Sequence, residues 1–99
     1  MMMFTVVVNG RHGAVKHTAG LDETIDFLRE NCYAVDYETI DQLAGLMAVI
    51  ENYETVAISS GNSVLLAKRR DEMTAACREL PVIGAEHGVY VPEVHHVAD

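Results

Sequence analysis

The sequence predicts an α+β fold, a single small domain over residues 1–99 in which a mostly antiparallel sheet of four to six strands carries about three helices on one face. The chain has 99 residues, enough for one core, and its 49% apolar and 22% charged residues are typical of globular domains. Short β-branched runs and glycine-rich turns flank segments whose apolar residues recur at helical spacing. The expected order is ββααββα followed by a short β hairpin.

The first expected element is a β hairpin. Residues 4–8 are rich in β-branched side chains and predict a strand. Residues 9–13 contain the asparagine and glycines of a tight reversal, so residues 14–18 should return as the second strand. Ala19 and Gly20 should end it.

Two amphipathic helices are expected next, over residues 22–32 and 37–52. Asp22 and Glu23 lie where the first helix dipole favours negative charge, and Asp36 is a suitable N-cap for the second. The small residues Ala44 and Gly45 predict a close contact with another helix or with a partner, although a tolerated glycine would explain Gly45 as well. The expected buried stripes are Leu21, Ile25, Leu28 and Cys32 in the first helix and Ile40, Leu43, Met47 and Ile50 in the second.

The second half of the chain resembles the first in its order of elements. Residues 54–59 alternate and predict a third strand, residues 60–62 a turn, and residues 63–68 a fourth strand. Asp71 should then open a third helix. Two ββα units in one chain would be an internal duplication, with coincidence as the alternative.

The end of the third helix is expected at Pro81, because proline removes a helical hydrogen bond. Residues 82–91 contain a glycine between two β-rich pairs and predict a final hairpin. Pro92 should place the residues after it at a sheet edge or in a loose end.

The negative charge is concentrated in one segment. Between Asp22 and Glu54 nine carboxylates stand against one base, Arg29, which gives the whole net charge of −8. Such a field opposes direct binding to nucleic acid or to anionic membranes and favours a basic protein partner, although solubility alone would also explain it. Three of the four tyrosines fall in or beside this segment. The residues predicted to bind a partner are Asp22, Asp26, Glu30, Tyr33, Asp36, Tyr37, Glu38 and Asp41.

Catalytic and cofactor chemistry is not expected. Residues 59–63 match neither a phosphate-binding loop nor a nucleophile elbow, and the carboxylates are predicted on solvated faces where their pKa values would not be pulled apart. A metal site is not expected either, although Glu93, His95, His96 and Asp99 are metal-capable residues near the end of the chain. His12 and His17 are expected to form a solvent-facing pair on the first hairpin.

The cytoplasm is the expected compartment. Cys32 and Cys77 are predicted to be buried free thiols, which suits a reducing environment. Residues 1–8 are too short and too poor in basic residues for a secretory signal, and no apolar run approaches the length that spans a bilayer. The one basic run, residues 68–70, could contact the acidic helices, a second copy of the chain or a phosphate.

These observations predict a non-catalytic acidic protein-binding module. An inhibitor that occludes a basic, nucleic-acid-binding surface of a larger protein would fit, by analogy of size and charge with small phage and mobile-element proteins that block host defence or replication. One alternative is a homodimeric small-molecule-binding protein or minor enzyme that uses the histidines. Another is a structural subunit that pairs through sheet edges or through the surface around Gly45.

Overall fold

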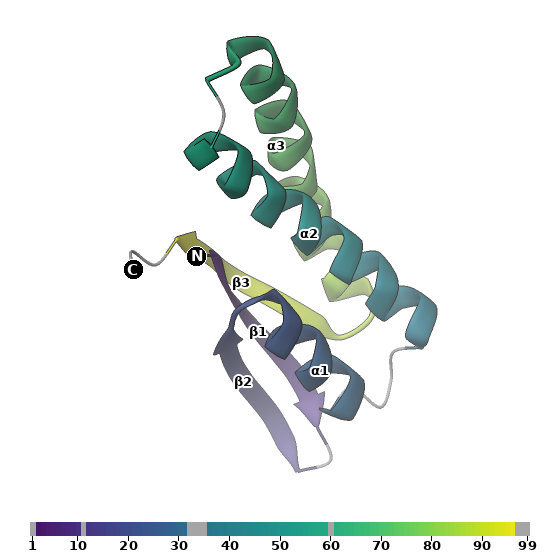
Figure 1. The fold of residues 1–99 in the computed structure, drawn as a ribbon. Coiled ribbons are helices and arrows are strands. Elements are labelled where there is room, and N and C mark those ends of the chain that lie inside the picture. The colour runs from purple at the N-terminus through teal and green to yellow at the C-terminus, as the bar shows by residue number, and fades with distance from the viewer. Residues whose placement is uncertain (1, 11, 32–35, 60, 97–99) are drawn as a thin grey trace.

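The computed structural model describes residues 2–10, 12–31, 36–59 and 61–96. Within them, a three-stranded antiparallel sheet is covered on one face by three helices (Figure 1). The α+β class is therefore confirmed, whereas the predicted sheet of four to six strands is wrong. The elements are β1 (Met2–Gly10), β2 (Gly13–Ala19), α1 (Leu21–Asn31), α2 (Tyr37–Ser59), α3 (Ser63–Glu86) and β3 (Val89–His96).

The predicted first hairpin is confirmed. β1 pairs with β2 up to Gly10 and Gly13. Gly13 has a φ of 124°, a backbone conformation that residues other than glycine rarely adopt. The hydroxyls of Thr5 and Thr18 lie 2.9 Å apart across the two strands. This bond fixes the register on the face of the sheet that no helix covers.

β3 pairs with the other side of β1, so the strand order is β2-β1-β3. The register shifts between Thr5 and Val7 of β1, which face Glu93 and Tyr90 of β3. Pro92 lies at this bulge in β3, which is an edge strand, so the predicted position of the residues after it at a sheet edge is confirmed. The predicted hairpin over residues 82–91 is wrong, because its first half belongs to α3.

The core lies between the sheet and the helices. Phe4, Val6 and Val8 of β1 are fully buried on the face of the sheet that the helices cover. α1 is fixed to the end of β2, where the Thr24 hydroxyl donates a hydrogen bond to the Ala19 carbonyl at 3.2 Å. The other buried hydrophobic residues of the core cluster are Ile25, Leu28, Ile40, Leu43, Met47, Ile50, Ala76, Leu80 and Val89.

The predicted third and fourth strands are wrong. Residues 54–59 continue α2 without a break, and residues 63–68 open α3. Asn62 caps α3, since its side-chain oxygen accepts bonds from the backbone amides of Val64 and Leu65, each at 3.1 Å. The turn was correctly located, but it joins two helices. The proposed ββα duplication is wrong for the same reason.

α3 also passes through Pro81, where the sequence predicted its end. Leu80 and Gly84 are buried on either side of the proline, so packing holds the last turn of the helix in place. A Cβ atom on Gly84 would collide with the Val89 carbonyl oxygen, because the end of α3 lies directly against the start of β3. Glycine is what permits this approach.

α2 and α3 form an antiparallel pair that extends well past the sheet (Figure 1). The molecule is accordingly elongated, with extents of 48 × 27 × 19 Å. We call residues 51–75 the tip. Among the tip side chains that the structure describes, none is buried. The rest of the described chain, the closed end, contains the whole core cluster.

Candidate functional site

Three of the predicted partner-binding residues share one face of α1. Asp22, Asp26 and Glu30 recur every four residues, and all three are exposed. Ile25 lies beside this row and Leu28 lies on the opposite face of α1, and both are buried against the core. The amphipathic pattern therefore turns this row of carboxylates toward solvent and along the side of α2, as predicted.

α2 presents a matching exposed row. Glu38, Asp41, Gly45 and Ala48 follow one another at steps of three, four and three, and all four are exposed. The row is acidic at its start and then consists of small residues. An ideal Cβ on Gly45 would meet no atom within 4 Å, so the close contact predicted there is not made by the described chain.

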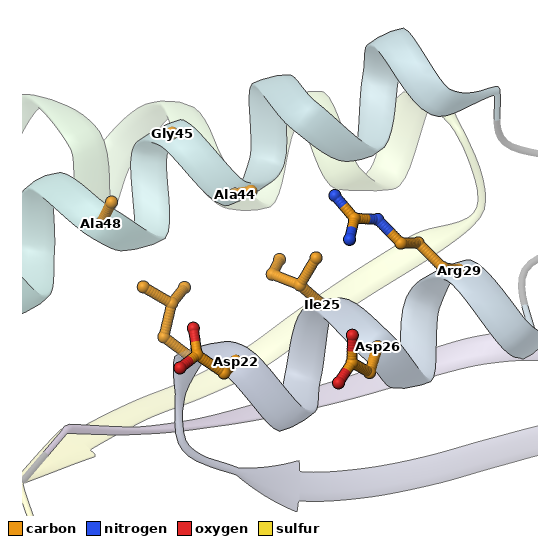
Figure 2. Close-up of a pocket in the computed structure, with 8 residues that line it drawn as sticks. Asp22, Ile25, Asp26, Arg29, Ala44, Gly45 and Ala48 are labelled. Carbon is orange, nitrogen blue, oxygen red and sulfur yellow. The ribbon is translucent and has the colours of Figure 1, made fainter.

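A groove of about 580 Å³ separates α1 from α2 (Figure 2). Figure 2 shows Ile25 pointing from α1 toward α2, with Ala44, Gly45 and Ala48 on the facing side. Apolar and small side chains thus form much of its lining. The acidic groove, as we call it, is lined by Leu21, Asp22, Ile25, Asp26, Arg29, Ala44, Gly45 and Ala48.

Arg29 links the two helices. Its guanidinium lies 3.5 Å from the Asp41 carboxylate, with 48% and 68% of the two side chains exposed. A pair this exposed contributes little to stability, typically below about 1 kcal/mol. Its effect on the site is local, because it neutralises Asp41 and leaves Asp22 and Asp26 as the unpaired acids of the groove among the described residues.

The start of α2 holds the other predicted residues. Asp36 caps the helix, where its carboxylate accepts a 2.8 Å bond from the Thr39 amide. Hydrogen bonds from the side chain and then the backbone of Thr39 hold the pKa of Asp36 below its ordinary value. Tyr37 is 74% exposed. These residues do not line the groove, and Tyr33 lies outside the described residues.

Only the small residues Ala44 and Gly45 of the apolar lining were predicted as a contact surface. Leu21 and Ile25 were expected in the core, which is correct for Ile25, while Leu21 is only half-buried at the edge of the groove. Ala44 was expected, with Gly45, to make a close contact with another helix or with a partner, and Ala48 carried no expectation. The available signal was the group of small residues at positions 44, 45 and 48, because small side chains on one helix face leave room for another element.

The histidines form no site that the described residues reveal. His17 stacks on Phe27 of α1, with ring centroids 4.3 Å apart, so the predicted solvent-facing pair with His12 is wrong. His95 Nδ1 lies 3.4 Å from a Glu93 carboxylate oxygen. Within the described part of the chain, no group of three or more His, Cys, Asp or Glu residues could hold a metal ion. The His96 side chain and Asp99 lie outside that part.

Cys77 is exposed on α3, so its predicted burial is wrong. Its thiol donates a weak bond to the sulfur of Met73 at 3.6 Å, and partial burial of the sulfur atom itself raises the pKa of the thiol. A raised pKa keeps the thiol protonated and poorly reactive at neutral pH. Cys32 lies outside the described residues.

No protein-family model, curated protein or solved structure matches this chain. Among its described helices, none is long and apolar enough to cross a membrane.

Proposed function

We propose that the chain is a non-catalytic protein-binding module whose acidic groove receives a basic and partly apolar segment of a larger protein. One observation carries the proposal: an open groove with an apolar lining is bordered by the carboxylates of Asp22 and Asp26, which make no ion pair with a described residue. Apolar lining favours burial of a side chain, and the adjacent acids select a positively charged neighbour. The two features occur together where α1 faces α2.

The shape of the groove suits a helix or an extended segment that carries Lys or Arg beside an apolar side chain. The absence of a side chain at Gly45 permits close approach to the α2 backbone. An apolar residue of the partner would cover Ile25 and Ala44, while its basic residues would pair with Asp22 and Asp26. The exposed acids on either side, Glu30 and Glu38, would mainly accelerate association.

A narrower proposal concerns inhibition. A basic protein surface is often one that holds nucleic acid, and a module that occupies it competes with that nucleic acid. With a net charge of −8, the chain carries the sign that such a competitor needs. The anti-defence role of small phage proteins remains an analogy for this proposal. It predicts that a captured partner loses nucleic-acid binding as the module is added.

The test is quantitative affinity capture from a bacterial lysate with four versions of the protein. The first is the unchanged chain, and the second carries Asp22→Lys and Asp26→Lys. The third carries Gly45→Leu, which adds an apolar side chain to the groove without changing any charge, at a position where a Cβ atom meets nothing within 4 Å. The fourth carries Ala85→Leu at an exposed position near the end of α3, outside both the groove and the tip, as a control for added apolar surface.

The proposal predicts a stoichiometric partner that the unchanged chain and the Ala85→Leu variant both capture. Charge reversal and groove filling should each lower its capture by about tenfold or more, the equivalent of roughly 1.4 kcal/mol. Added salt should weaken capture by the unchanged chain. Failure to find any protein that responds to both substitutions would contradict the proposal.

A further inference from the structure

The tip lacks a third layer. A helix in water is stabilised mainly by burying its apolar stripe against other elements, and the sheet and α1 provide this only at the closed end. On α2, half-buried Leu46 and Val49 pack against the core, and the same stripe continues as Tyr53 and Val56 in the tip. α3 is the helix that lies beside α2 there (Figure 1).

α3 brings its own apolar residues to the tip. Leu65, Leu66 and Met73 are half-buried, and Val64 is 79% exposed. Met73 also packs against the core cluster. We call the half-buried apolar residues of the two tip helices, Tyr53, Val56, Leu65, Leu66 and Met73, the seam, and it stays partly open to solvent. Two helices of a bundle normally complete such a seam by packing against two more.

The charge of the tip differs from that of the remaining chain. Residues 51–75 contain four acids and three bases and net 3 − 4 = −1, so the other residues carry −7 of the total −8. On α2 the tip carries only acids, whereas on α3 it carries three bases followed by Asp71 and Glu72. Glu51 and Glu54 lie on α2, and the bases at residues 68–70 lie on α3.

Two of these bases have no ion-pair partner within the described chain. Arg69 donates to both carboxylate oxygens of Glu72, at 3.0 and 2.8 Å. Lys68 and Arg70 are exposed and make no ion pair with a described residue. The basic run predicted to contact acidic helices or a second copy therefore forms no ion pair with the described acidic helices of its own chain.

We propose that the tip is the interface of a symmetric homodimer, in which α2 of one copy lies along α3 of the other and the two hairpins form a four-helix bundle. A two-fold axis requires a self-complementary surface. The tip is self-complementary, because across a two-fold axis the acids of α2 in each copy lie beside the bases at the start of α3 in the other. Two chains of charge −8 also repel least when they meet at this nearly neutral region, which contains none of the residues that line the acidic groove.

The main competing surface is the uncovered face of the sheet. Tyr90 is 49% exposed there, with Val7 beside it in the register of β1 and β3. Antiparallel sheets commonly leave one face in water, so that face needs no partner. It therefore serves as the control surface for the experiment.

The experiment is sedimentation equilibrium of the full chain from about 1 µM to about 1 mM, a range that covers weak and moderate dimers. The proposal predicts a monomer–dimer equilibrium. Val56→Glu should raise the dimer dissociation constant on the order of 100-fold, because it would bury a charge without a partner. Tyr90→Glu on the sheet face should leave that constant unchanged.

Charge reversal tests which helices meet. One variant carries Lys68→Glu and Arg70→Glu, and the other carries Glu51→Lys and Glu54→Lys. Each alone should dimerise at least about tenfold more weakly than the unchanged chain, and an equimolar mixture should recover dimers. Circular dichroism of every variant verifies that it remains folded.

A strict monomer at the highest concentration would overturn the proposal. So would a dimer that tolerates Val56→Glu but is lost with Tyr90→Glu, because that result assigns the interface to the sheet. Failure of the mixture to recover dimers would reject the pairing of α2 with α3. None of these outcomes depends on the acidic groove, so the proposed function and the dimer fail independently.

Discussion

The closed end and the tip are built from the same two helices, yet only one of them has a core. At the closed end α2 packs on α1 and β1 while α3 packs on β3, and their residues Leu43, Met47 and Leu80 are completely buried. In the tip the same helices continue with half-buried seam residues such as Tyr53 and Leu66. The two helices therefore extend beyond the core to which they contribute.

The comparison also separates two kinds of surface. The acidic groove lies over a complete core and carries acids without ion-pair partners among the described residues, so it suits an unlike partner. The tip is nearly neutral with both signs present and lacks a completed seam, which suits a like partner. Charge distinguishes their occupants, because both surfaces offer apolar contacts.

The largest difference should appear on truncation of a leucine. Leu43→Ala at the closed end removes a completely buried side chain and should lower the free energy of unfolding by about 2–5 kcal/mol. Leu65→Ala in the tip, where the side chain is only partly buried, should cost about 1 kcal/mol or less. Urea unfolding at low micromolar concentration, where copies stay apart, measures both. Equal losses at the two sites would contradict the division into a closed end and a tip.

Two glycines sharpen the comparison within the helices. Gly84→Ala places a methyl group against the Val89 carbonyl and should lower the free energy of unfolding by about 1–3 kcal/mol. Gly45→Ala meets open space in the middle of α2 and should raise it by up to about 1 kcal/mol. Thermal unfolding of both variants shows whether each substitution raises or lowers stability. A stabilising Gly84→Ala would show that α3 does not lie close against β3.

The smallest effect concerns the cap of α2 and depends on pH. Because the folded pKa of Asp36 lies below its unfolded value, its carboxylate adds stability above pH about 4, and this is lost as the pH falls through the folded pKa. Asp36→Asn keeps an acceptor for the Thr39 amide but cannot titrate. The stability difference between the two proteins should therefore shrink in acid. A difference that stays constant down to full protonation would exclude this role for Asp36.

Sequence reasoning succeeded where the signals were local. The glycines at 10 and 13 predicted the first reversal, Asp36 predicted the start of α2, and the helical spacing predicted its buried residues up to Ile50. The exposed acids of α1 and α2 were also placed correctly. Their apolar neighbours in the groove were missed because a groove between helices depends on how two elements pack.

The two strands predicted in the tip were wrong because the preference of β-branched residues for strands is weak and depends on the surrounding structure. Thr55 and Val56 are typical strand residues, but here they extend a helix that is already nucleated. The signal for α3 was present at Asn62, an N-cap followed by strong helix formers. β3 could not be paired from its sequence, because its contact with β1 joins the two ends of the described chain.

Amide hydrogen exchange of the full chain at two concentrations tests most directly the claim that the closed end is complete and the tip is not. We predict that β1 and the α2 amides up to Ile50 are equally protected in dilute and concentrated solution. Tip amides, from Glu51 to Ala75, should exchange rapidly when dilute and become protected as the concentration rises. Tip amides that are already as protected as the core in dilute solution would contradict the account.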